Sequence, residues 1–517
     1  MSVFYFKILL KGTLYVLIPT LFLGFIGMSL LSGFVITCLK APLNYIPFHL
    51  GILSLPPVIG LLSLVLSSAG VSCGPWYFDR LSWLMAWFVT TISFFVQKYS
   101  MRYLLADQSY RKYFALLTIT AAAASVTWLS NDFRLLLAGW GVTLWGLTGL
   151  IGLRKEWPAT RHAAALSGKL LGASWILLSV TVLWIAYRTG IWEFSLLSQS
   201  SLDELHASER LFLNMLLFIS VMIPAAQWPF QRWLLDSAVA PTPISAVMHA
   251  GIVNGGGIFL TRLAPLATEH SQLILLITSS LSVLLGTGFM LVQVDYKRQL
   301  VGSTIAQMGF MLVQCALGSY WAAIAHAVLH GLFKATLFLQ SGSVAKPKDS
   351  VPHASKSPAS LWIIAGGAIS LVGGTGIWIS SHVESYQVIS AVIFGLSAFI
   401  SWMQVVASGR GWISKITGMI LVAGTAVLFN VIHKAFKQML HPALPEGTTL
   451  SVTIAFIFLL VIVMCNLLFA WFIRNRTLPV SVIVYLWLLR LSEPQNNAVE
   501  VRTRRPISTS VGRRTQY

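Results

Sequence analysis

Apolar segments of about 20 residues follow one another almost end to end along this chain, separated by short polar connections. A helix of that length crosses the hydrocarbon core of a bilayer, because each residue adds about 1.5 Å to the helix. The pattern therefore predicts an all-α, polytopic membrane protein with about 13 to 15 transmembrane helices. The expected spans are 12–36, 49–71, 79–97, 113–130, 135–153, 166–187, 211–238, 243–262, 272–293, 299–317, 322–343, 359–380, 386–407, 416–435 and 449–473.

The two ends of the chain differ from this pattern. Residues 12–36 are too long for a signal-peptide core and no small-residue cleavage site follows, so we expect this span to be retained. Residues 478–491 are apolar but short, and they either lie in the membrane interface or add a short span. We expect residues 1–476 to form a transmembrane domain. We expect residues 477–517 to contain this short apolar segment, followed by a basic, disordered cytoplasmic tail.

Composition supports the membrane assignment and narrows the function. The 517 residues are 56% hydrophobic and 10% charged, whereas soluble proteins carry about 25% charged residues. The net charge of +19 would suggest nucleic acid in a soluble chain, but here the bases lie in short connections and we expect no nucleic-acid partner. No Walker A, dinucleotide-binding or HExxH motif occurs, and the four cysteines lack metal-type spacing. We therefore expect no metal, no cofactor and no enzymatic chemistry in this chain.

The basic residues predict an orientation. Most of them follow odd-numbered spans, which places them on one side of the membrane, and the positive-inside rule makes that side cytoplasmic and the N-terminus external. They are Lys98, Arg102, Arg111 and Lys112 after the third span, Arg154, Lys155 and Arg161 after the fifth, Lys297 and Arg298 after the ninth, Lys346, Lys348 and Lys356 after the eleventh, Arg410 and Lys415 after the thirteenth, and Arg474, Arg476 and the tail arginines after the fifteenth. Lys7, Lys11, Lys434 and Lys437 do not follow the rule.

The span 322–343 carries the strongest functional signal. His326, His330 and Lys334 are spaced i, i+4 and i+8, so they line one face of a helix. A charged group near mid-bilayer costs at least ~2.5–3.5 kcal/mol and normally faces protein or a water-filled interior. The stripe predicts a proton relay. The alternative is that neighbouring helices satisfy both histidines and that Lys334 reaches an interface.

The segment 211–238 is too long for an upright span and contains Pro224 and Pro229. Each proline removes a helical hydrogen bond, and free carbonyls at this depth are tolerated in protein or beside a water-filled cavity. We expect a broken helix with a hydrated site lined by Arg232 and Asp236, which are four residues apart and can pair. A plain proline kink is the alternative.

Two neighbouring regions carry weaker signals. Pro241 and Pro243 begin the next helix, and His249 lies about two turns into it, where a lone histidine more often packs than transfers protons. Gly255 to Gly257 permit close approach of helices. The span 386–407 contains no charged residue, so the sequence shows no exit path for an ion.

Three stretches resemble the proton-conducting antiporter-like subunits of respiratory complex I and the Mrp antiporters. They are AAQWPFQRWLLDSAVAPTPISAVMHAGIVNGGG (225–257), VDYKRQLVGSTIAQMGFMLVQCALGSYWAAIAHAVLHGLFKATLFLQSGSV (294–344) and FDRLSWLMAWFVTTISFFVQKYSMRYL (78–104). They place the core signature at about 70–344. Within this superfamily, HAGIVNGGGIFLTRLAPL and STIAQMGFMLVQCALG look most like the DabB family, the membrane subunits of a two-component inorganic carbon pump.

The resemblance implies a partner and a pathway. DabB-type subunits work with DabA, a zinc-containing, carbonic anhydrase-like protein, and the pair is thought to use a cation gradient to drive CO2 hydration in bacteria. His326, His330 and Lys334 match the family's relay helix, and His249 matches the histidine after the Pro-Thr-Pro turn. Lys169 matches a basic position of the sixth span, and Lys297 lies in the second signature stretch. The resemblance implies a multi-pass protein of the bacterial inner membrane.

The chain also departs from the complex I pattern. Gly141 follows Trp140 where complex I-type subunits carry a glutamate, and Pro224 stands where they carry a lysine. The Glu–Lys pair of the first half-channel is therefore absent, which favours the carbon pump over the alternative, a proton-translocating subunit of a complex I-like or Mrp-type assembly. A third hypothesis is a structural membrane anchor whose relay residues are vestigial.

Overall fold

The computed structural model describes residues 2–39, 42–66, 70–105, 107–342, 360–379, 385–407, 411–444, 448–474 and 479–493. The predicted basic connection with Lys346, Lys348 and Lys356, and the predicted disordered tail after residue 493, lie outside these residues. Arg410 and Arg476 lie outside them as well.

The described chain is almost entirely helical, as the apolar pattern predicts. In the first part the helices are α1 (Ser2–Cys38), α2 (Tyr45–Leu53), α3 (Leu55–Leu66), α4 (Arg80–Tyr103), α5 (Tyr110–Leu129), α6 (Phe133–Ile151), α7 (Pro158–Thr189), α8 (Ala207–Met222), α9 (Arg232–Asp236), α10 (Thr242–Ala250) and α11 (Gly255–Arg262). The second part holds α12 (Glu269–Val292), α13 (Tyr296–Ala316), α14 (Tyr320–Ser341), α15 (Ser360–Ile379), α16 (Ser385–Ser401), α17 (Gly411–Leu440), α18 (Val452–Arg474) and α19 (Pro479–Ser492). Short 3-10 turns η1 (Phe194–Leu196), η2 (Ser200–Leu202), η3 (Ser237–Val239), η4 (Ile252–Asn254), η5 (Ala264–Leu266) and η7 (His441–Ala443), and a π-helix η6 (Trp402–Ala407), complete the helical elements.

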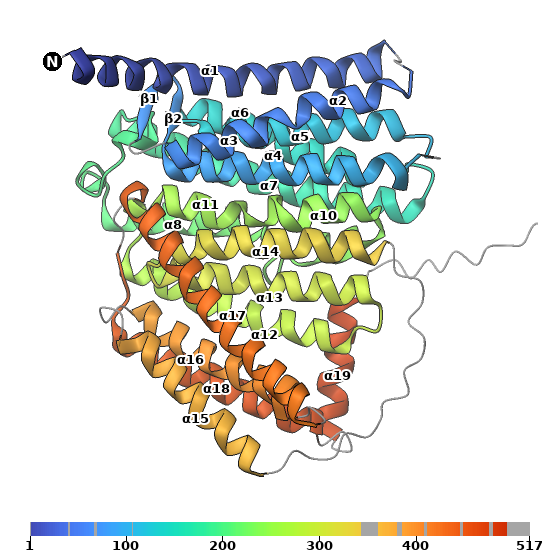
Figure 1. Ribbon diagram of the computed structural model, residues 1–517, viewed down its shortest axis with the longest axis vertical. Coiled ribbons are helices and arrows are strands. Elements are labelled where there is room, and N and C mark those ends of the chain that lie inside the picture. Colours follow the sequence, from blue (N-terminus) through green and yellow to red (C-terminus); the bar gives the residue numbers. More distant parts are fainter. Residues whose placement is uncertain are drawn as a thin grey trace, which may run out of the picture.

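Each of the fifteen predicted spans corresponds to a helix or to a pair of consecutive helices. Among the described residues, ten helical segments are long and apolar enough to cross a membrane on their own. Other helices, such as α4 and α13, are more polar and lie in the same bundle with their axes roughly parallel to those of α5 and α14 (Figure 1). The predicted all-α, multi-pass membrane fold is confirmed.

A small β-hairpin between α3 and α4 was not predicted. Strands β1 (Val71–Cys73) and β2 (Trp76–Phe78) pair antiparallel, and Val71 lies opposite Phe78. Gly74 has a φ of 56°, a left-handed conformation that glycine adopts without steric cost. The apolar pattern extends the second span to residue 71, but helix α3 ends at Leu66.

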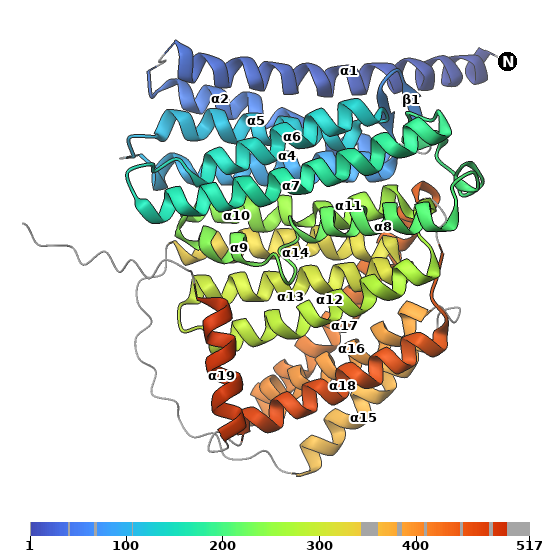
Figure 2. The same ribbon diagram turned by 180° about the vertical axis from the view of Figure 1, so that it is seen from behind.

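The antiparallel course of the helices brings the basic connections together. The α4–α5, α6–α7 and α12–α13 connections and the end of α14 lie at one end of the bundle, which we call the basic end (Figures 1 and 2). The first turns of α1 and the last turns of α17, which carry the four exceptions to the rule, lie at the other end, which we call the far end. That the basic end faces the cytoplasm stays a prediction.

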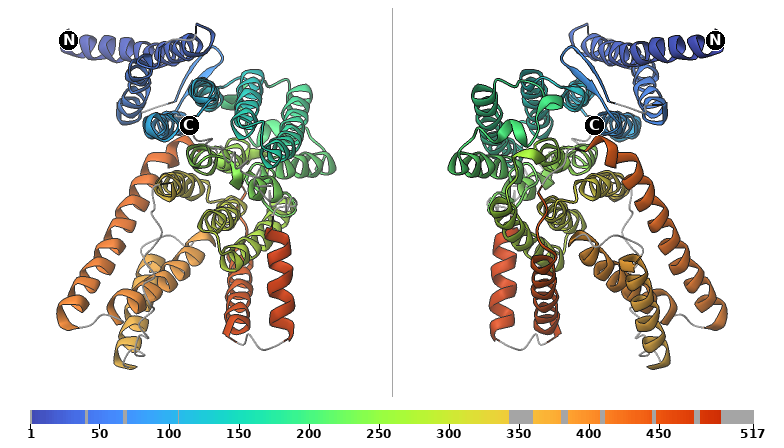
Figure 3. Two further views of the ribbon diagram at one scale, coloured as in Figure 1. Left: turned by 90° about the vertical axis from the view of Figure 1, so that its right-hand side faces the viewer. Right: turned by 90° about the vertical axis from the view of Figure 1, so that its left-hand side faces the viewer.

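Helix α19 settles how the last apolar segment lies. It runs across the bundle, roughly perpendicular to α12 and α13 (Figures 2 and 3). Gln293 Nε2, just after α12, donates a hydrogen bond of 2.7 Å to Ser492 Oγ. A Cβ at Gly288 would lie 2.9 Å from the Leu488 side chain. The segment therefore packs across the end of α12 and does not add a parallel span.

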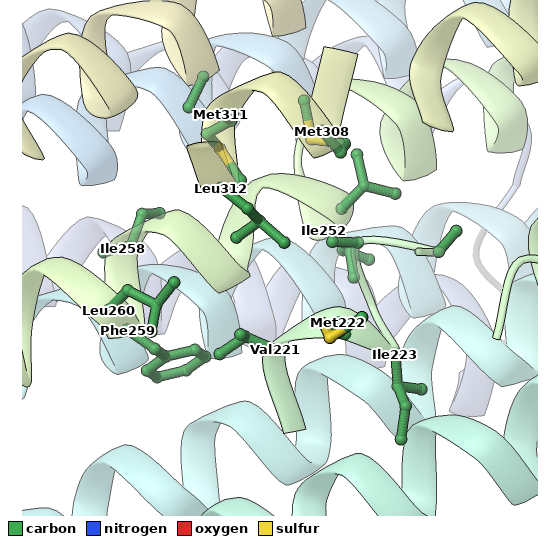
Figure 4. Packing of buried hydrophobic residues seen from close by; sticks show 14 of the residues in the cluster. Val221, Met222, Ile223, Ile252, Ile258, Phe259, Leu260, Met308, Met311 and Leu312 are labelled. Carbon is green, nitrogen blue, oxygen red and sulfur yellow. The ribbon is translucent and has the colours of Figure 1, made fainter. Parts of the chain in front are cut away.

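The glycine-rich start of α11 is the tightest part of the core. A Cβ at Gly255 would meet Trp140 at 2.6 Å, one at Gly256 would meet the Val221 carbonyl oxygen at 3.0 Å, and one at Gly257 would meet Met311 at 2.7 Å. Figure 4 shows this packing, where the end of α8 meets α11 and α13. The predicted close approach of helices is realised here on three sides of one helix, which positions α13 beside the interrupted helix.

Candidate functional site

The predicted relay residues lie on α14, which α13 and α10 flank. Lys334 is 1% exposed, and its Nζ donates a hydrogen bond of 3.0 Å to the carbonyl oxygen of Leu300 on α13. His330 is also buried, and its ring centroid lies 5.9 Å from that of His326. The side chain of Lys334 thus ends inside the protein. This excludes the alternative in which Lys334 reaches a membrane interface.

His249 is linked to Lys334 through α13. The Thr304 hydroxyl donates to the same Leu300 carbonyl oxygen at 3.0 Å, and its oxygen lies 3.1 Å from Nδ1 of His249. A hydroxyl has one hydrogen, and Thr304 uses it on the Leu300 carbonyl oxygen. The contact between Thr304 and His249 therefore needs a hydrogen on Nδ1 of His249. Lys334 and Thr304 thus both donate to one carbonyl oxygen, and Thr304 in turn contacts His249. A carbonyl oxygen only accepts, so these contacts position the lysine and the histidine and are not themselves a path for a proton.

Two imidazole nitrogens in this cluster remain free to exchange a proton. Nε2 of His249 and Nε2 of His330 are buried without a hydrogen-bond partner among the residues that the structure describes. A buried polar atom normally has a partner, and exceptions call for a water, an ion or a functional role. The ring of His249 stacks on Phe338 at 4.3 Å, which fixes its orientation.

Lys297 extends the cluster toward the basic end. Its Nζ donates a hydrogen bond to the carbonyl oxygen of Ala240, at the end of η3. Both Lys297 and Lys334 interact electrostatically with His249. The structure therefore brings His249, Lys297 and Lys334 together with the histidines of α14.

The other face of α14 borders a cavity. His326, His330 and Lys334 line an open cavity of about 730 Å³, bounded also by α13, α16 and α17. Water-sized groups fit this volume many times over, whereas the contact of Lys334 with α13 is closely packed. The relay stripe thus has a packed polar side and an open side.

The helix predicted to be broken is interrupted between Met222 and Arg232. The residues of the interruption are buried: Ala225, Ala226 and Gln227 have no exposed surface. The expected hydrated site stays a prediction. The Ile223 carbonyl oxygen accepts the Trp233 indole N–H at 2.6 Å. Near Pro224 and Pro229, a neighbouring side chain therefore donates a hydrogen bond to a backbone carbonyl oxygen of the interruption.

Further hydrogen bonds close the break. The Trp228 N–H donates to Ser282 Oγ at 3.1 Å, and Gln227 Nε2 donates to the carbonyl oxygens of Ala225 and Ile305. Ala226 has a φ of 53°, which is uncommon for a residue other than glycine and marks the sharp reversal of the chain.

Asp236 and Arg232 frame the short helix α9 rather than a cavity. The Asp236 carboxylate lies 3.6 Å from Nε2 of His162 on α7, an ion-pair distance when the imidazole is protonated. The expected pairing with Arg232 stays a prediction. Sequence analysis did not single out His162, because it stands among polar residues at the start of a helix. Arg232 is half-buried.

Lys169 is separated from the relay cluster. It is exposed on α7, a helix that packs against α6, α8 and α9. The family match alone suggested this residue, and its position on the outer surface of α7 gives it no contact with α14.

At Gly141, where complex I-type subunits carry a glutamate, the Trp175 side chain fills the adjoining space. A Cβ at Gly141 would lie 2.9 Å from Nε1 of Trp175, and this indole N–H donates to the Leu137 carbonyl oxygen at 2.8 Å. A glutamate at 141 would require Trp175 to move.

Comparisons with known proteins agree with this fold. The sequence profile described as "NADH:quinone oxidoreductase/Mrp antiporter, TM" matches residues 130–359, and that of "NADH-Ubiquinone oxidoreductase (complex I), chain 5 N-terminus" matches residues 74–114. The Mrp complex from Dietzia sp. DQ12-45-1b superposes with a TM-score of 0.62 at 19% identity, over 91% of this chain and 58% of that one. This structural likeness shows the fold alone.

Two relatives match almost the full length. "Probable inorganic carbon transporter subunit DabB" of Bacillus anthracis is 45% identical over 483 residues, which cover 93% of this chain and 95% of that protein. The protein of the same name from Bacillus subtilis (strain 168) is 46% identical, over 93% and 96%. By contrast, the chloroplastic NAD(P)H-quinone oxidoreductase subunit 5 of Chara vulgaris is 35% identical over 52% of this chain and 42% of its own length. The chain therefore belongs to the DabB family of the antiporter-like membrane proteins related to complex I and Mrp subunits.

Proposed function

We propose that this chain is the membrane subunit of an energy-coupled inorganic carbon transporter. In this proposal it conducts protons along α14 and thereby drives a DabA-like, zinc-containing, carbonic anhydrase-like partner. The names of its full-length relatives support the transporter subunit. The observation that supports proton conduction is the cluster of buried titratable side chains, His249, His330 and Lys334, beside an open cavity, in which Nε2 of His249 and Nε2 of His330 have no partner among the described residues.

The alternative of a complex I-type subunit has less support. That mechanism requires an acidic group after Trp140, and Trp175 fills this space. The interrupted helix carries Pro224 in place of a lysine. A pathway that uses α14 and α10 without the first Glu–Lys pair fits these residues better.

Lys334 provides the test of conduction. In a carbonic anhydrase-deficient host that also produces the partner, we expect Lys334→Met to abolish growth in air. Lys334→Arg should fail as well, because arginine retains its proton. The measurement is growth rate, with expression and partner co-purification checked in parallel.

Lys169→Met is the matched control, because it removes a lysine from an apolar helix away from the cluster and should leave growth unchanged. Full growth of the Lys334→Met strain would contradict the relay and favour the anchor hypothesis.

For the partner, we propose docking at the basic end. Lys98, Arg102 and Lys112 are exposed there, and complementary charge guides the encounter and orientation of two proteins. Arg154 is less suited to bind the partner, because its guanidinium already forms an ion pair of 2.7 Å with Asp107. This ion pair ties the α6–α7 connection to the α4–α5 connection and holds the surface in shape.

Reversing the three exposed charges to glutamate should lower co-purification of the partner several-fold, with binding that depends more steeply on salt. Lys434→Glu, at the far end, is the control and should bind normally. Equal recovery of the triple variant and the control at low and high salt would argue against docking through this surface.

A further inference from the structure

An open groove lies between α6 and α7 on the outer surface of the bundle (Figure 2). Its volume is about 580 Å³, and its wall is almost entirely apolar. The Thr148 hydroxyl and the Trp175 indole N–H, which belong to lining residues, already donate to backbone carbonyl oxygens of α6 at 2.9 Å and 2.8 Å. The groove therefore offers an occupant mainly apolar contacts.

Missing side chains create this groove. Gly168 and Gly172 lie four residues apart on α7, and Gly141 lines the groove from α6. A Cβ at Gly172 would meet no heavy atom within 4 Å, so the space beside this residue is open. Two small residues at this spacing usually allow a second transmembrane helix to approach closely. Here α6 packs against α7 but leaves the space beside Gly172 unfilled.

The groove extends along one half of the membrane thickness. Along α6 it runs from Thr148, near the basic end, to Ala138, which is about 15 Å at 1.5 Å per residue. The hydrocarbon layer of a single leaflet is also about 15 Å thick, half of the ~30 Å core. The length of the groove therefore matches an acyl chain of the leaflet at the basic end.

Toward the far end, the same two helix faces carry large side chains. Leu183 follows Gly172 by eleven residues on α7 and is 42% exposed. Arg134 precedes Gly141 by seven residues and stacks on Trp192 at 5.0 Å. A transmembrane helix from a partner would need a groove across both leaflets, so the short groove favours a lipid chain over a helix.

Arg161 supplies a positive charge above the basic-end opening. It precedes Gly168 by seven residues and Gly172 by eleven, so the three share one face of α7. The helix rise places it about 10 Å beyond Gly168, comparable with a headgroup layer of about 5–8 Å. Arg161 is exposed and has no acidic partner among the described residues. Lys169 follows Gly168 but does not line the groove.

We propose that the groove between α6 and α7 binds a phospholipid of the basic-end leaflet, with one acyl chain against Gly168 and Gly172 and a negatively charged headgroup at Arg161. Lipid tails are as apolar as the groove, so moving the chain out of the bilayer contributes little. Retention depends instead on close packing in the groove and on paired hydrogen bonds from the guanidinium to the phosphate. This site does not depend on which ion or substrate the protein transports.

Native mass spectrometry of the full-length protein with its partner counts the bound lipids. With phosphatidylglycerol added, we expect Gly172→Leu to lower retention of one lipid molecule about tenfold, because leucine fills the open space without a clash. Gly24→Leu is the matched control, since a Cβ at this exposed position of α1 also meets nothing within 4 Å. Ala138→Phe, at the exposed deep end of the groove, fills it from α6 and serves as a second variant if Gly172→Leu does not fold.

Arg161→Gln tests the headgroup separately from the groove. The affinity for phosphatidylglycerol should fall about tenfold, to that for phosphatidylcholine, whose headgroup has no net charge, while phosphatidylcholine binding changes little. Equal lipid retention by the wild type and the folded filling variants would overturn the proposal, as would equal affinity of the wild type for both lipids.

A filling variant that loses the partner but retains the lipid would assign the groove to a protein helix and would also overturn the proposal. Because lipid retention is measured without growth or transport, a failure of the proposed function would leave this result unchanged.

Discussion

Two buried histidine sites in this protein differ in their hydrogen bonding. His49 on α2 is fully buried, and both of its ring nitrogens have partners: Nδ1 lies 2.9 Å from Ser32 Oγ, and Nε2 lies 3.1 Å from Thr118 Oγ1 and 3.3 Å from Gln97 Oε1. On α14, by contrast, His330 leaves Nε2 without a partner among the described residues and borders a cavity.

This difference in hydrogen bonding suits the two histidines to different roles. A histidine whose two nitrogens are satisfied by side chains of three other helices holds those helices together, and moving its proton would break a hydrogen bond. A histidine with a free nitrogen beside an open volume can accept and release a proton without that loss. His49 therefore has the surroundings of a structural histidine, whereas His330 has the surroundings that the proposed relay requires.

The largest expected effect is on stability, at His49. His49→Ala removes one hydrogen bond from each of Ser32, Thr118 and Gln97, and a buried hydrogen bond contributes about 0.5–1.5 kcal/mol. It also leaves a cavity among the helices around His49, which adds to the cost. We expect a clear fall in the thermal unfolding temperature in detergent, with transport per folded protein retained. His270→Ala, at an exposed position at the start of α12, is the matched control. A stable His49→Ala protein without transport would reverse the comparison.

The next effect is on transport, at His330. His330→Ala should slow carbon-dependent growth or proton uptake about tenfold, equivalent to about 1.4 kcal/mol, with an unchanged unfolding temperature. The loss should be smaller than at Lys334, because the adjoining cavity allows water to bridge the gap. Proton uptake in vesicles is the measurement. A fall in stability without a change in uptake would assign His330 the structural role of His49.

A smaller effect is expected at Thr304, on the packed side of the relay. Thr304→Val keeps the shape but removes the hydroxyl that joins His249 to the Leu300 carbonyl, a hydrogen bond worth about 1 kcal/mol, or about fivefold in rate. Thr304→Ser, which keeps the hydroxyl, should restore uptake. If valine and serine behave alike, the hydrogen bond from His249 to Thr304 does not position the imidazole for proton exchange.

A second contrast concerns the two places where helices are irregular. The prolines of 211–238 led us to expect water at the break, yet Trp233, Ser282 and Gln227 satisfy the freed backbone. The open cavity beside α14 is instead bordered in part by the π-helical segment Trp402–Ala407, where the sequence shows neither a proline nor a charge. Helix-breaking residues therefore located one stretch of irregular backbone but not this cavity.

The sequence by itself determined the fold class, the order of the spans and the shared face of His326, His330 and Lys334. Those features depend on local periodicity and on the cost of placing polar groups in a bilayer, which act along one helix at a time. Tertiary structure decided what each helix face meets. Only the packing of α10, α13 and α14 joins His249 to Lys334, and only the arrangement of α13, α16 and α17 brings serines, glutamines and His433 around one cavity. It also distinguished Lys334 from Lys169, because burial depends on the neighbouring helices and not on the residue type or its spacing.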